Sequence, residues 1–518
     1  MTSSSRVAIA ALLLAAAAAL PGCLSSSELQ CVSGTVRCGD TCVATQTDSK
    51  NCGSCGSACS GGNVCVAGAC VCPVGQDVCG GLCTNVASDP RNCGTCGLTC
   101  GDQQACNQGI CQDCSSGGCQ TALMAGCISG LNVGAVRRIQ DTPGGLVLEA
   151  PLNPPGASFP DALGVLGSAL LYADSTSASL FEIPLADLAT ASSEKKQLAA
   201  ISFPGTSQLY VEPADGGTRL YAVASAAQSI RIFGGPPAAD AGQLLAGGAG
   251  SLGLVELGGV PFDPSSYPEP FGKIGTSLFV PLNGTGKVVR VEVSDPANPR
   301  VTDTYDLQPL VAALPGGGVV SDGGLYLPSP TQALARNGYV YVAVNVLRLY
   351  GLTPGADYGP PLVVRIDPSK QGQAAVSAVP GLVTDAGTYT CQNVEWLGAL
   401  SLGSAASPML VSCAGARSLD KNYEITAVTN TALLLLDGSD RPIAAWVPST
   451  GAGQPPPSVG RAVAQNTAVY VADETASRLY VIDYATNSFV ERVGYVDGGT
   501  PPQVCTSYLS DLKVVPAP

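Results

Sequence analysis

Cysteines are the residues whose spacing is most ordered in this chain, and sixteen of them form two matching sets. The stretch "NCGSCGSACSGGNVCVAGAC" at 51–70 returns as "NCGTCGLTCGDQQACNQGIC" at 92–111. Thiols at such spacings can form disulfides, bind a metal or carry out redox chemistry. Each cysteine of the second set lies 41 residues after its counterpart; the sets are Cys31, Cys38, Cys42, Cys52, Cys55, Cys59, Cys65 and Cys70, then Cys72, Cys79, Cys83, Cys93, Cys96, Cys100, Cys106 and Cys111.

Three chemistries are open to these thiols. Cys52 and Cys55, like Cys93 and Cys96, have the two-residue separation of a zinc knuckle, and the same spacing occurs in redox motifs. A repeat of 41 residues with hardly an aromatic side chain cannot bury enough apolar surface to fold without cross-links. We therefore expect structural disulfides and no bound metal, although eight cysteines allow 105 pairings among which the sequence does not choose.

The N-terminus predicts the oxidising compartment that disulfides need. Arg6 precedes an apolar run of 14 residues, from Val7 to Leu20, which is within the ~7–15 residues of a signal-peptide core. A membrane-spanning helix requires ~20 residues. We therefore expect an exported protein whose cysteines are oxidised.

The residues that follow the apolar run are "LPGC" at 20–23, which resembles the lipobox of bacterial lipoproteins. The resemblance implies cleavage before Cys23 and lipidation of Cys23, with a signal peptide at 1–22 and a lipidated tether at 23–30. Ordinary secretory cleavage is the alternative. Because no Asp follows the cysteine, the resemblance also implies an outer-membrane lipoprotein of the cell envelope, facing either the periplasm or the cell surface. The membrane would then be a partner through the anchor.

The repeated pattern "CGxxCV…D…NCGxCGxxC…C…C" resembles the stigma-specific-protein-like cysteine-rich repeat of myxobacterial surface proteins. On this basis we place repeat 1 at 31–71 and repeat 2 at 72–112. The resemblance implies extracellular disulfide modules and offers no catalytic residues.

Composition excludes several functions. The chain has no histidine, which removes Ser-His-Asp triads, Cys-His nucleophiles and His-bound zinc or haem. Only 12% of the residues are charged and the net charge is −14, so nucleic acid is not an expected partner. With 63 glycines and 39 prolines, turns must be frequent, and an all-β chain is favoured.

Short apolar runs recur after about residue 130, and each is followed by a second strand-like run. Paired strands repeating every ~40–60 residues are typical of a β-propeller. The last unit, "VYVADETASRLYVIDYATNSFVERV", resembles the YVTN-type propeller repeat. Six units are visible, and the ends at 135–152 and 507–515 can pair into a seventh. The runs are "LLYADS" at 170–175, "LYAVAS" at 220–225, "LFVPLN" at 278–283, "VYVAVN" at 340–345, "MLVSCA" at 409–414 and "VYVADE" at 469–474.

The predicted fold is therefore all-β, with disulfide-rich small modules followed by a connector at 113–129 and a β-propeller at 130–518. We expect seven blades, with six as the alternative. For the cysteines outside the repeats, we predict Cys391–Cys413 within one blade, Cys114–Cys119 in the connector, and Cys127–Cys505 joining the two ends of the ring. The last pair tests ring closure.

The function expected from these features is binding. A lipid-anchored envelope protein would hold its propeller off the membrane on a disulfide-stapled stalk and bind a surface protein, a glycan or a wall component. Since the chain has two tryptophans, Trp396 and Trp446, an aromatic platform for sugars is not evident, which slightly favours a protein partner. No cofactor is expected for binding.

Two alternatives remain. One is a passive structural spacer. The other is a lactonase or related hydrolase, because YVTN-like propellers include lactonases and the gluconolactonase type binds a divalent cation through Glu, Asn and Asp. Asn345, Glu395 and Asp473 lie at or near the expected inner strands and are the candidates. Carboxylates that converge at one mouth of the propeller would favour an enzyme, and an exposed apolar patch would favour a binder.

Overall fold

Short antiparallel strands make up nearly all of the regular structure in the computed structural model of this chain. Contacts divide the chain into two compact units, Met1–Pro73 and Val74–Pro518. The structure describes residues 31, 34–48, 50–59, 63–72, 77–79, 82–84, 95–96, 104–107, 110–113, 122–128, 134–142, 145–152, 160–166, 169–177, 179–184, 196–199, 205–214, 217–235, 254–314, 325–349, 356–379, 382, 391–399, 408–419, 425–448, 457–465, 468–475, 478–485, 488–491, 505 and 508–515.

The cysteine repeats consist of small hairpins. Each is an antiparallel pair of three- or four-residue strands, too short to be stable without cross-links. The pairs are β1 (Val36–Cys38) with β2 (Thr41–Val43), β3 (Val64–Val66) with β4 (Ala69–Val71), β5 (Asp77–Cys79) with β6 (Leu82–Thr84), and β7 (Gln104–Asn107) with β8 (Ile110–Asp113).

The rest of the described chain forms seven antiparallel sheets of at least four strands, the blades of a β-propeller. We number the blades 1 to 7 by their innermost strands, most of which contact the innermost strand of the next blade. These strands are β12 (Pro160–Leu166), β16 (Thr206–Ala214), β20 (Gly272–Ile274), β24 (Leu327–Arg336), β29 (Val394–Ala399), β35 (Val459–Gln465) and β39 (Tyr508–Val515).

The other strands follow outward in each blade. The second strands of blades 1 to 7 are β13 (Ala169–Asp174), β17 (Gly217–Ala224), β21 (Ser277–Leu282), β25 (Tyr339–Leu349), β30 (Met409–Cys413), β36 (Ala468–Asp473) and β9 (Ala122–Ile128). The third strands are β14 (Ser179–Pro184), β18 (Ser229–Gly235), β22 (Lys287–Glu292), β27 (Leu362–Ile366), β33 (Ala432–Leu436), β37 (Arg478–Ala485) and β10 (Gly134–Thr142). The outermost strands are β15 (Lys196–Ala199), β19 (Val255–Pro261), β23 (Arg300–Asp306), β28 (Val376–Ala378), β34 (Pro442–Trp446), β38 (Ser488–Glu491) and β11 (Gly145–Pro151).

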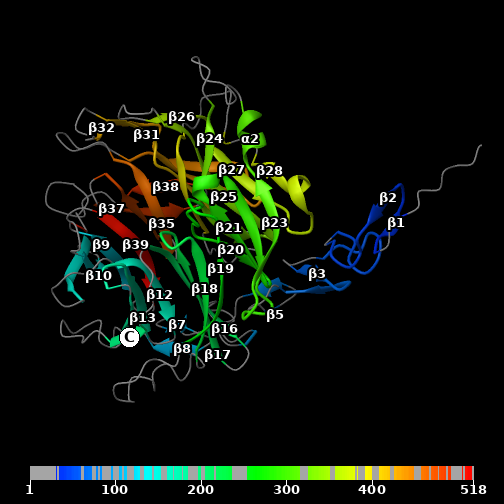
Figure 1. Cartoon of the computed structure of the whole chain (residues 1–518), viewed down its shortest axis with the longest axis horizontal. Helices are drawn as coiled ribbons and strands as arrows, with labels where there is room; N and C mark the ends of the chain where they lie inside the picture. Colours follow the sequence, from blue (N-terminus) through cyan, green and yellow to red (C-terminus); the bar gives the residue numbers. More distant parts are fainter. Residues whose placement is uncertain are drawn as a thin grey trace, which may run out of the picture. The chain divides into compact units, whose positions relative to one another are not determined.

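Blade 7 closes the ring with strands from both ends of the chain. The C-terminal β39 pairs antiparallel with β9, so that the last strand is innermost and three strands from residues 122–151 lie outside it. Figure 1 shows the red β39 beside the cyan β9 and β10. The predicted seventh blade is thus confirmed, and the alternative of six blades is wrong.

Several additional elements lie outside the four-strand pattern of the blades. Blade 4 carries β26 (Ala356–Tyr358) against β25, and blade 5 carries a hairpin of β31 (Ala416–Leu419) and β32 (Ile425–Thr429) between its second and third strands. The helical turns are α2 (Gln308–Ala312), η3 (Asn283–Thr285) and η4 (Gly372–Ala375). A search of the described residues finds no helix with the length and apolar character to cross a membrane.

The apolar runs found in the sequence are the second strands of blades 1 to 6. Every residue of β21, β30 and β36 is buried, because each sheet is covered on both faces by neighbouring blades. A strand buried on both faces is continuously apolar rather than alternating. The innermost strands carry polar residues, so the apolar pattern did not reveal them.

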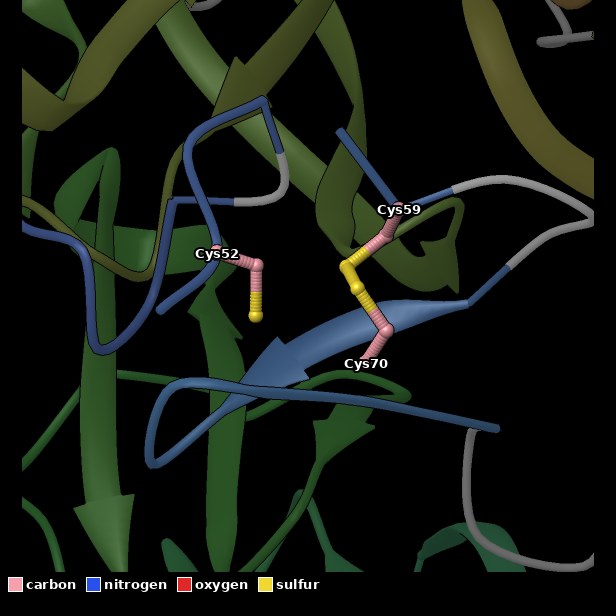
Figure 2. Close-up of side chains that lie close together, drawn as sticks. All are labelled: Cys52, Cys59 and Cys70. Atoms are coloured by element: carbon pink, nitrogen blue, oxygen red, sulfur yellow. A yellow bond between two sulfur atoms is a disulfide. The ribbon is translucent and has the colours of Figure 1, made fainter. Parts of the chain in front are cut away.

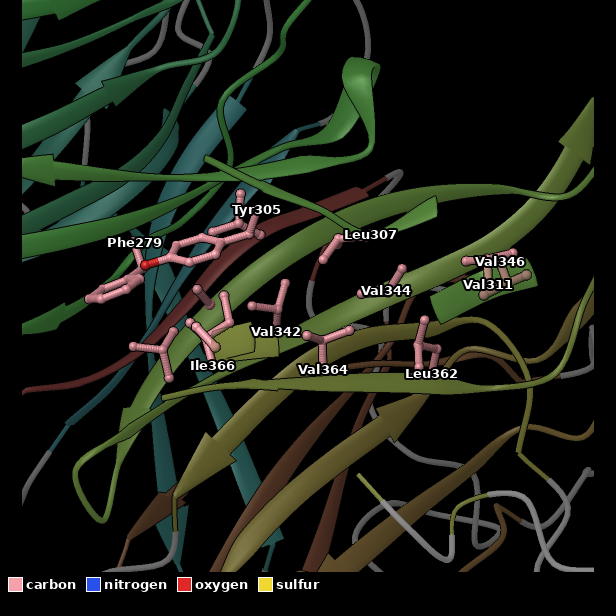
Figure 3. Packing of buried hydrophobic residues seen from close by; sticks show 14 residues of the cluster. Phe279, Tyr305, Leu307, Val311, Val342, Val344, Val346, Leu362, Val364 and Ile366 are labelled. Carbon is pink, nitrogen blue, oxygen red and sulfur yellow. The ribbon is translucent and has the colours of Figure 1, made fainter. Parts of the chain in front are cut away.

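The hydrophobic core is divided into clusters that join neighbouring blades. Seven clusters of buried side chains occur in the described part of the chain, one at each of the seven interfaces of the ring. Figure 3 shows the interface of blades 3 and 4, where Phe279 and Tyr305 pack near Val342, Val364 and Ile366. Each blade is therefore stabilised by both of its neighbours.

Candidate functional site

The cysteines of repeat 1 are all cross-linked. The four disulfides are Cys31–Cys42, Cys38–Cys55, Cys52–Cys65 and Cys59–Cys70. Among the described residues, the sulfurs of Cys52, Cys59 and Cys70 form the one group of three potential ligands within 4.8 Å. Figure 2 shows Cys52 beside the Cys59–Cys70 disulfide. Because thiolates are the metal-binding form, these bonded sulfurs are a scaffold and do not fit zinc.

Repeat 2 contains a disulfide at the position equivalent to one in repeat 1. Cys79–Cys96 corresponds to Cys38–Cys55 after the shift of 41, and Cys72 is also disulfide-bonded. Of the other cysteines of repeat 2, Cys83, Cys106 and Cys111 lie in β6, β7 and β8, and Cys93 and Cys100 lie outside the described residues. We expect the same connectivity, hence Cys72–Cys83, Cys93–Cys106 and Cys100–Cys111.

Peptide mass spectrometry of the non-reduced protein checks this pairing. The expected cross-linked peptides join cysteines 11, 17, 13 and 11 residues apart, as in repeat 1. Free thiols, or peptides that join repeat 1 to repeat 2, would contradict the shared connectivity. Repeat 1 serves as the internal control in the same digest.

Two of the three predicted pairs outside the repeats are present in the structure. Cys391 is bonded to Cys413 across 22 residues, and Cys127 is bonded to Cys505 across 378 residues. The second bond joins the two ends of the chain in blade 7. Cys114, Cys119 and Cys23, the expected lipidation site, lie outside the described residues.

In five blades a β-bulge in the innermost strand leaves one extra residue unpaired with the second strand. In blade 1, for example, Pro160 pairs with Asp174 and Ala162 with Ala173, which leaves Asp161 as the extra residue. In blade 3 the register shifts between the isolated Pro268–Leu282 bridge and β20, and in blade 6 it shifts between Val459 and Ala462, so Glu269 and Gly460 are assigned there by analogy with the other blades. Bulges re-aim side chains and are frequent beside functional sites. We call the seven extra residues the bulge ring: Asp161, Ser207, Glu269, Thr331, Glu395, Gly460 and Ser510.

Three members of the bulge ring are acidic, and all three have raised pKa values. Burial raises the pKa of Asp161 to about 6 and that of Glu269 to about 8. Burial and the charge of Glu474 raise the pKa of Glu395 well above its ordinary value. Perturbed carboxyls at equivalent positions of blades 1, 3 and 5 identify this end of the propeller as the candidate site.

In several blades, the side chain of the residue after the bulge accepts a hydrogen bond from a backbone N–H of the next blade. Such bonds fix the positions of neighbouring innermost strands relative to each other. Gln208 accepts from Phe271 N at 2.9 Å, Gln332 accepts from Leu397 N at 2.6 Å, and Asp511 accepts from Leu163 N at 2.8 Å.

A polar cluster spans the middle of the ring. Arg461 of blade 6 forms an ion pair with Asp511 of blade 7, and its guanidinium carbon lies 4.7 Å from the ring centroid of Trp396 in blade 5. Arg461 also opposes the burial-induced rise in the pKa of Glu269, which belongs to blade 3. Since blades 3 and 6 lie on opposite sides of the ring, this interaction crosses the propeller axis.

A second cluster, which we call the Glu395 site, consists of Asn393, Glu395, Arg417 and Glu474. Nη2 of Arg417 is 2.6 Å from Oε2 of Glu474 and 3.6 Å from Oε1 of Glu395. Nδ2 of Asn393 donates to Oε1 of Glu395 at 2.9 Å, and Glu474 lies close enough to raise the pKa of Glu395. One guanidinium therefore forms ion pairs with two adjacent carboxyls.

The Glu395 site is enclosed but accessible. The side chains of Glu395, Glu474 and Arg417 retain 21%, 22% and 24% of their surface. Tyr358 in β26 lies close enough for Arg417 and Glu395 to influence its pKa, which burial raises. The two insertions of the fold, β26 and the β31–β32 hairpin, thus bring Tyr358 and Arg417 to the site.

Backbone features hold Glu474 in place. Gly460, the bulge residue of blade 6, has no Cβ, and a Cβ there would overlap the side chain of Glu474. Asp473 accepts hydrogen bonds from Ser458 N at 3.0 Å and Thr475 N at 2.9 Å, which fixes the turn that contains Glu474. A glycine and a turn-capping carboxylate are therefore needed before the two glutamates can meet.

Of the three residues proposed from sequence, only Glu395 lies on an innermost strand. Asn345 is in β25 opposite Ser329, and Asp473 ends β36 and caps a turn. Trp446 is on the outermost strand β34, where its indole N–H donates to Glu491. The structure brings Glu395 to Glu474 and Arg417 instead.

Sequence reasoning missed the bulge ring, although one signal was present. In blades 1, 3, 4 and 6 the bulge residue lies eight positions before the first residue of the second strand. Pro160, Pro268 and Pro330 immediately precede three bulge residues, as proline often does where a strand begins. Glu474 and Arg417 carry no such signal, because they come from a turn and an inserted hairpin.

The ligand set of a gluconolactonase-type metal site does not fit these residues. Asp473 is engaged by the N–H groups of its turn, and the guanidinium of Arg417 already lies beside both glutamates where a divalent cation would sit. A second, doubly charged cation there would be repelled at close range.

Comparison with known proteins gives one family match, which lies in the cysteine repeats. Residues 71–114 match the Stigma-specific STIG1-like protein family, and this segment contains all of repeat 2. No curated protein matches the chain in sequence.

Solved structures that resemble the chain are propellers with low sequence identity. A candidate 6-phosphogluconolactonase from Bacteroides uniformis is 10% identical over 76% of this chain and 99% of its own, with a TM-score of 0.45. AztD from Citrobacter koseri is 12% identical over 76% and 98%, with a TM-score of 0.42. The periplasmic gluconolactonase PpgL of Pseudomonas aeruginosa is 11% identical over 77% and 99%, with a TM-score of 0.32. At such identities the likeness concerns the fold alone.

Proposed function

We propose that this protein is an exported, lipid-anchored binding protein of the cell envelope. The apolar run at 7–20, the lipobox-like "LPGC" and the oxidised cysteines support export and anchoring at Cys23. The disulfide-bonded repeats form a stalk between the anchor and the propeller, with the outer membrane as the site of attachment. The peptide digest described above also tests the anchor: an acylated Cys23 as first residue is expected, and an unmodified Cys23 would contradict it.

We infer that the propeller binds its ligand at the Glu395 site. The observation that carries this conclusion is a pair of enclosed, partly accessible carboxyls that share one guanidinium. Two carboxyls held together beside a single guanidinium are costly to ionise at the same time, so a chain that retains them is typical of a site completed by a ligand. The ligand class remains a surface protein, a glycan or a wall component.

Envelope binding by matched variants tests this proposal. The full-length protein is incubated with isolated cell envelopes, and the bound fraction is measured for the wild type, Glu395→Gln, Gly460→Ala and Glu256→Gln. We expect about a tenfold or larger loss for Glu395→Gln, because an amide replaces a hydrogen-bonded charged group. Gly460→Ala should have a similar effect because it displaces Glu474 without changing any charge.

Glu256→Gln is the control, since Glu256 lies on the outermost strand β19 and its side chain is 40% exposed. Equal binding by all four proteins would refute the assignment of the ligand to the Glu395 site.

A hydrolase is the second candidate, favoured by the raised pKa of Glu395. A carboxyl that stays protonated near neutral pH can act as a general acid beside an ionised partner. Hydrolysis of glucono-δ-lactone that disappears in Glu395→Gln and persists in Glu256→Gln would support this alternative. Binding without turnover would exclude it for that substrate class.

A further inference from the structure

The charge balance of the Glu395 site limits what can complete it. Glu395 and Glu474 carry two negative charges when both are ionised, and Arg417 supplies one positive charge. One further positive charge restores neutrality. A divalent cation would leave an excess positive charge next to a guanidinium in an enclosed site, so a univalent cation is favoured.

An unused acceptor belongs to the same site. Asn393 is 5% exposed, and its Nδ2 donates to Glu395, yet its Oδ1 has no hydrogen-bond partner among the described atoms. A buried polar atom without a partner is costly, and its presence indicates a missing donor. Asn393 also has a φ of +57°, a conformation that Asn tolerates better than most residues.

The acceptors match a particular donor. The two carboxyls and Oδ1 of Asn393 are acceptors within one cluster of hydrogen-bonded and ion-paired side chains. A primary ammonium has one positive charge and three N–H donors on one nitrogen. We propose that the Glu395 site binds a primary ammonium group of the ligand, either a lysine-type side chain or an amino sugar. This inference rests on the proposed binding function and specifies its ligand chemistry.

Binding of an ammonium should displace a proton. Burial and the charge of Glu474 raise the pKa of Glu395, so the free site keeps a proton to a higher pH than an ordinary carboxyl does. The charged and titratable groups that face Glu395 are Glu474, Arg417 and Tyr358. Because the ammonium requires both carboxylates, affinity should rise as the pH rises through the raised pKa. For a lysine-type side chain, affinity should fall again near the pKa of the amine, about 10, and for an amino sugar at a lower pH because its amine is less basic.

Isothermal titration of the detergent-solubilised, full-length protein tests the proposal. The probes are Nα-acetyl-lysine amide and glucosamine, with the Nε-trimethylated lysine analogue, N-acetylglucosamine and calcium chloride as comparisons. We expect one of the two amines to bind with release of up to about one proton, measured in two buffers of different ionisation enthalpy. Binding of the lysine amide would identify a protein as the source of the ammonium group, and binding of glucosamine would identify an amino sugar. Glu395→Gln should weaken binding about 30-fold, and Glu256→Gln should not.

Three results would overturn the inference. The first is that neither amine binds. The second is that the trimethylated analogue, which has no N–H donor, binds as tightly as the lysine probe. The third is that calcium binds in a Glu395-dependent manner and the amines do not. The results also distinguish a failure of the ammonium proposal from a failure of the proposed envelope binding. Glu395-dependent envelope binding that neither amine can displace would defeat the inference alone. Amine binding without envelope binding would defeat the envelope function alone.

Discussion

Replacing both Cys127 and Cys505 by alanine is expected to lower the free energy of unfolding by about 6 kcal/mol. The disulfide closes a loop of 378 residues, and the chain-entropy relation assigns its stabilisation to the freedom that this loop removes from the unfolded chain. Both side chains are buried in the core between blades 6 and 7, so alanine introduces no polar group there. Urea denaturation, followed by the fluorescence of Trp396 and Trp446, measures the loss.

The double variant Cys391→Ala with Cys413→Ala is the matched control. Its cysteines are equally buried but close a loop of only 22 residues, for which the same relation gives about 3 kcal/mol. The larger loss should therefore belong to the ring-closing pair. A loss for Cys127 and Cys505 that is no greater than the control would show that the backbone bonds between β39 and β9 hold the ring closed without the disulfide.

Asp440→Asn is expected to cost about 3–5 kcal/mol, the usual effect of breaking a buried ion pair. Asp440 accepts from Arg336 of blade 4 at 2.9 Å, and from Tyr341 and Arg365 at 3.1 Å each. The side chains of Arg336 and Asp440 are each only 2% exposed. Asparagine has nearly the same side-chain volume as aspartate and tolerates the φ of +63° at this position. The loss of stability therefore measures the effect of removing the negative charge. Thermal or urea denaturation provides the measurement.

Glu256→Gln is the control for Asp440→Asn. It removes a carboxylate from the pair with Arg231, whose side chains are 27% and 40% exposed, and should cost less than about 1 kcal/mol. Similar small losses for both variants would mean that the Asp440 network does not stabilise the contact between blades 4 and 5.

The cysteine repeats, the all-β propeller and the closure of its ring can all be predicted from the amino-acid sequence. Regular cysteine spacing can be recognised without a structure, and an apolar run such as "VYVADE" must be a buried strand wherever it is placed. The ends at 135–152 and 507–515 had strand-like patterns but no partners nearby in the chain. Pairing them was therefore the simplest way to complete a seventh blade, and Cys127–Cys505 followed from it.

The Glu395 site was decided by the tertiary structure alone. Glu395 is placed by a bulge, Glu474 by a turn beside Gly460, and Arg417 by a hairpin inserted in another part of blade 5. These elements are separated along the chain and share no periodic pattern, because hydrophobic periodicity reports only which side chains are buried. Bulges, turns and insertions set the directions of polar side chains, and those directions depend on the packing of neighbouring blades.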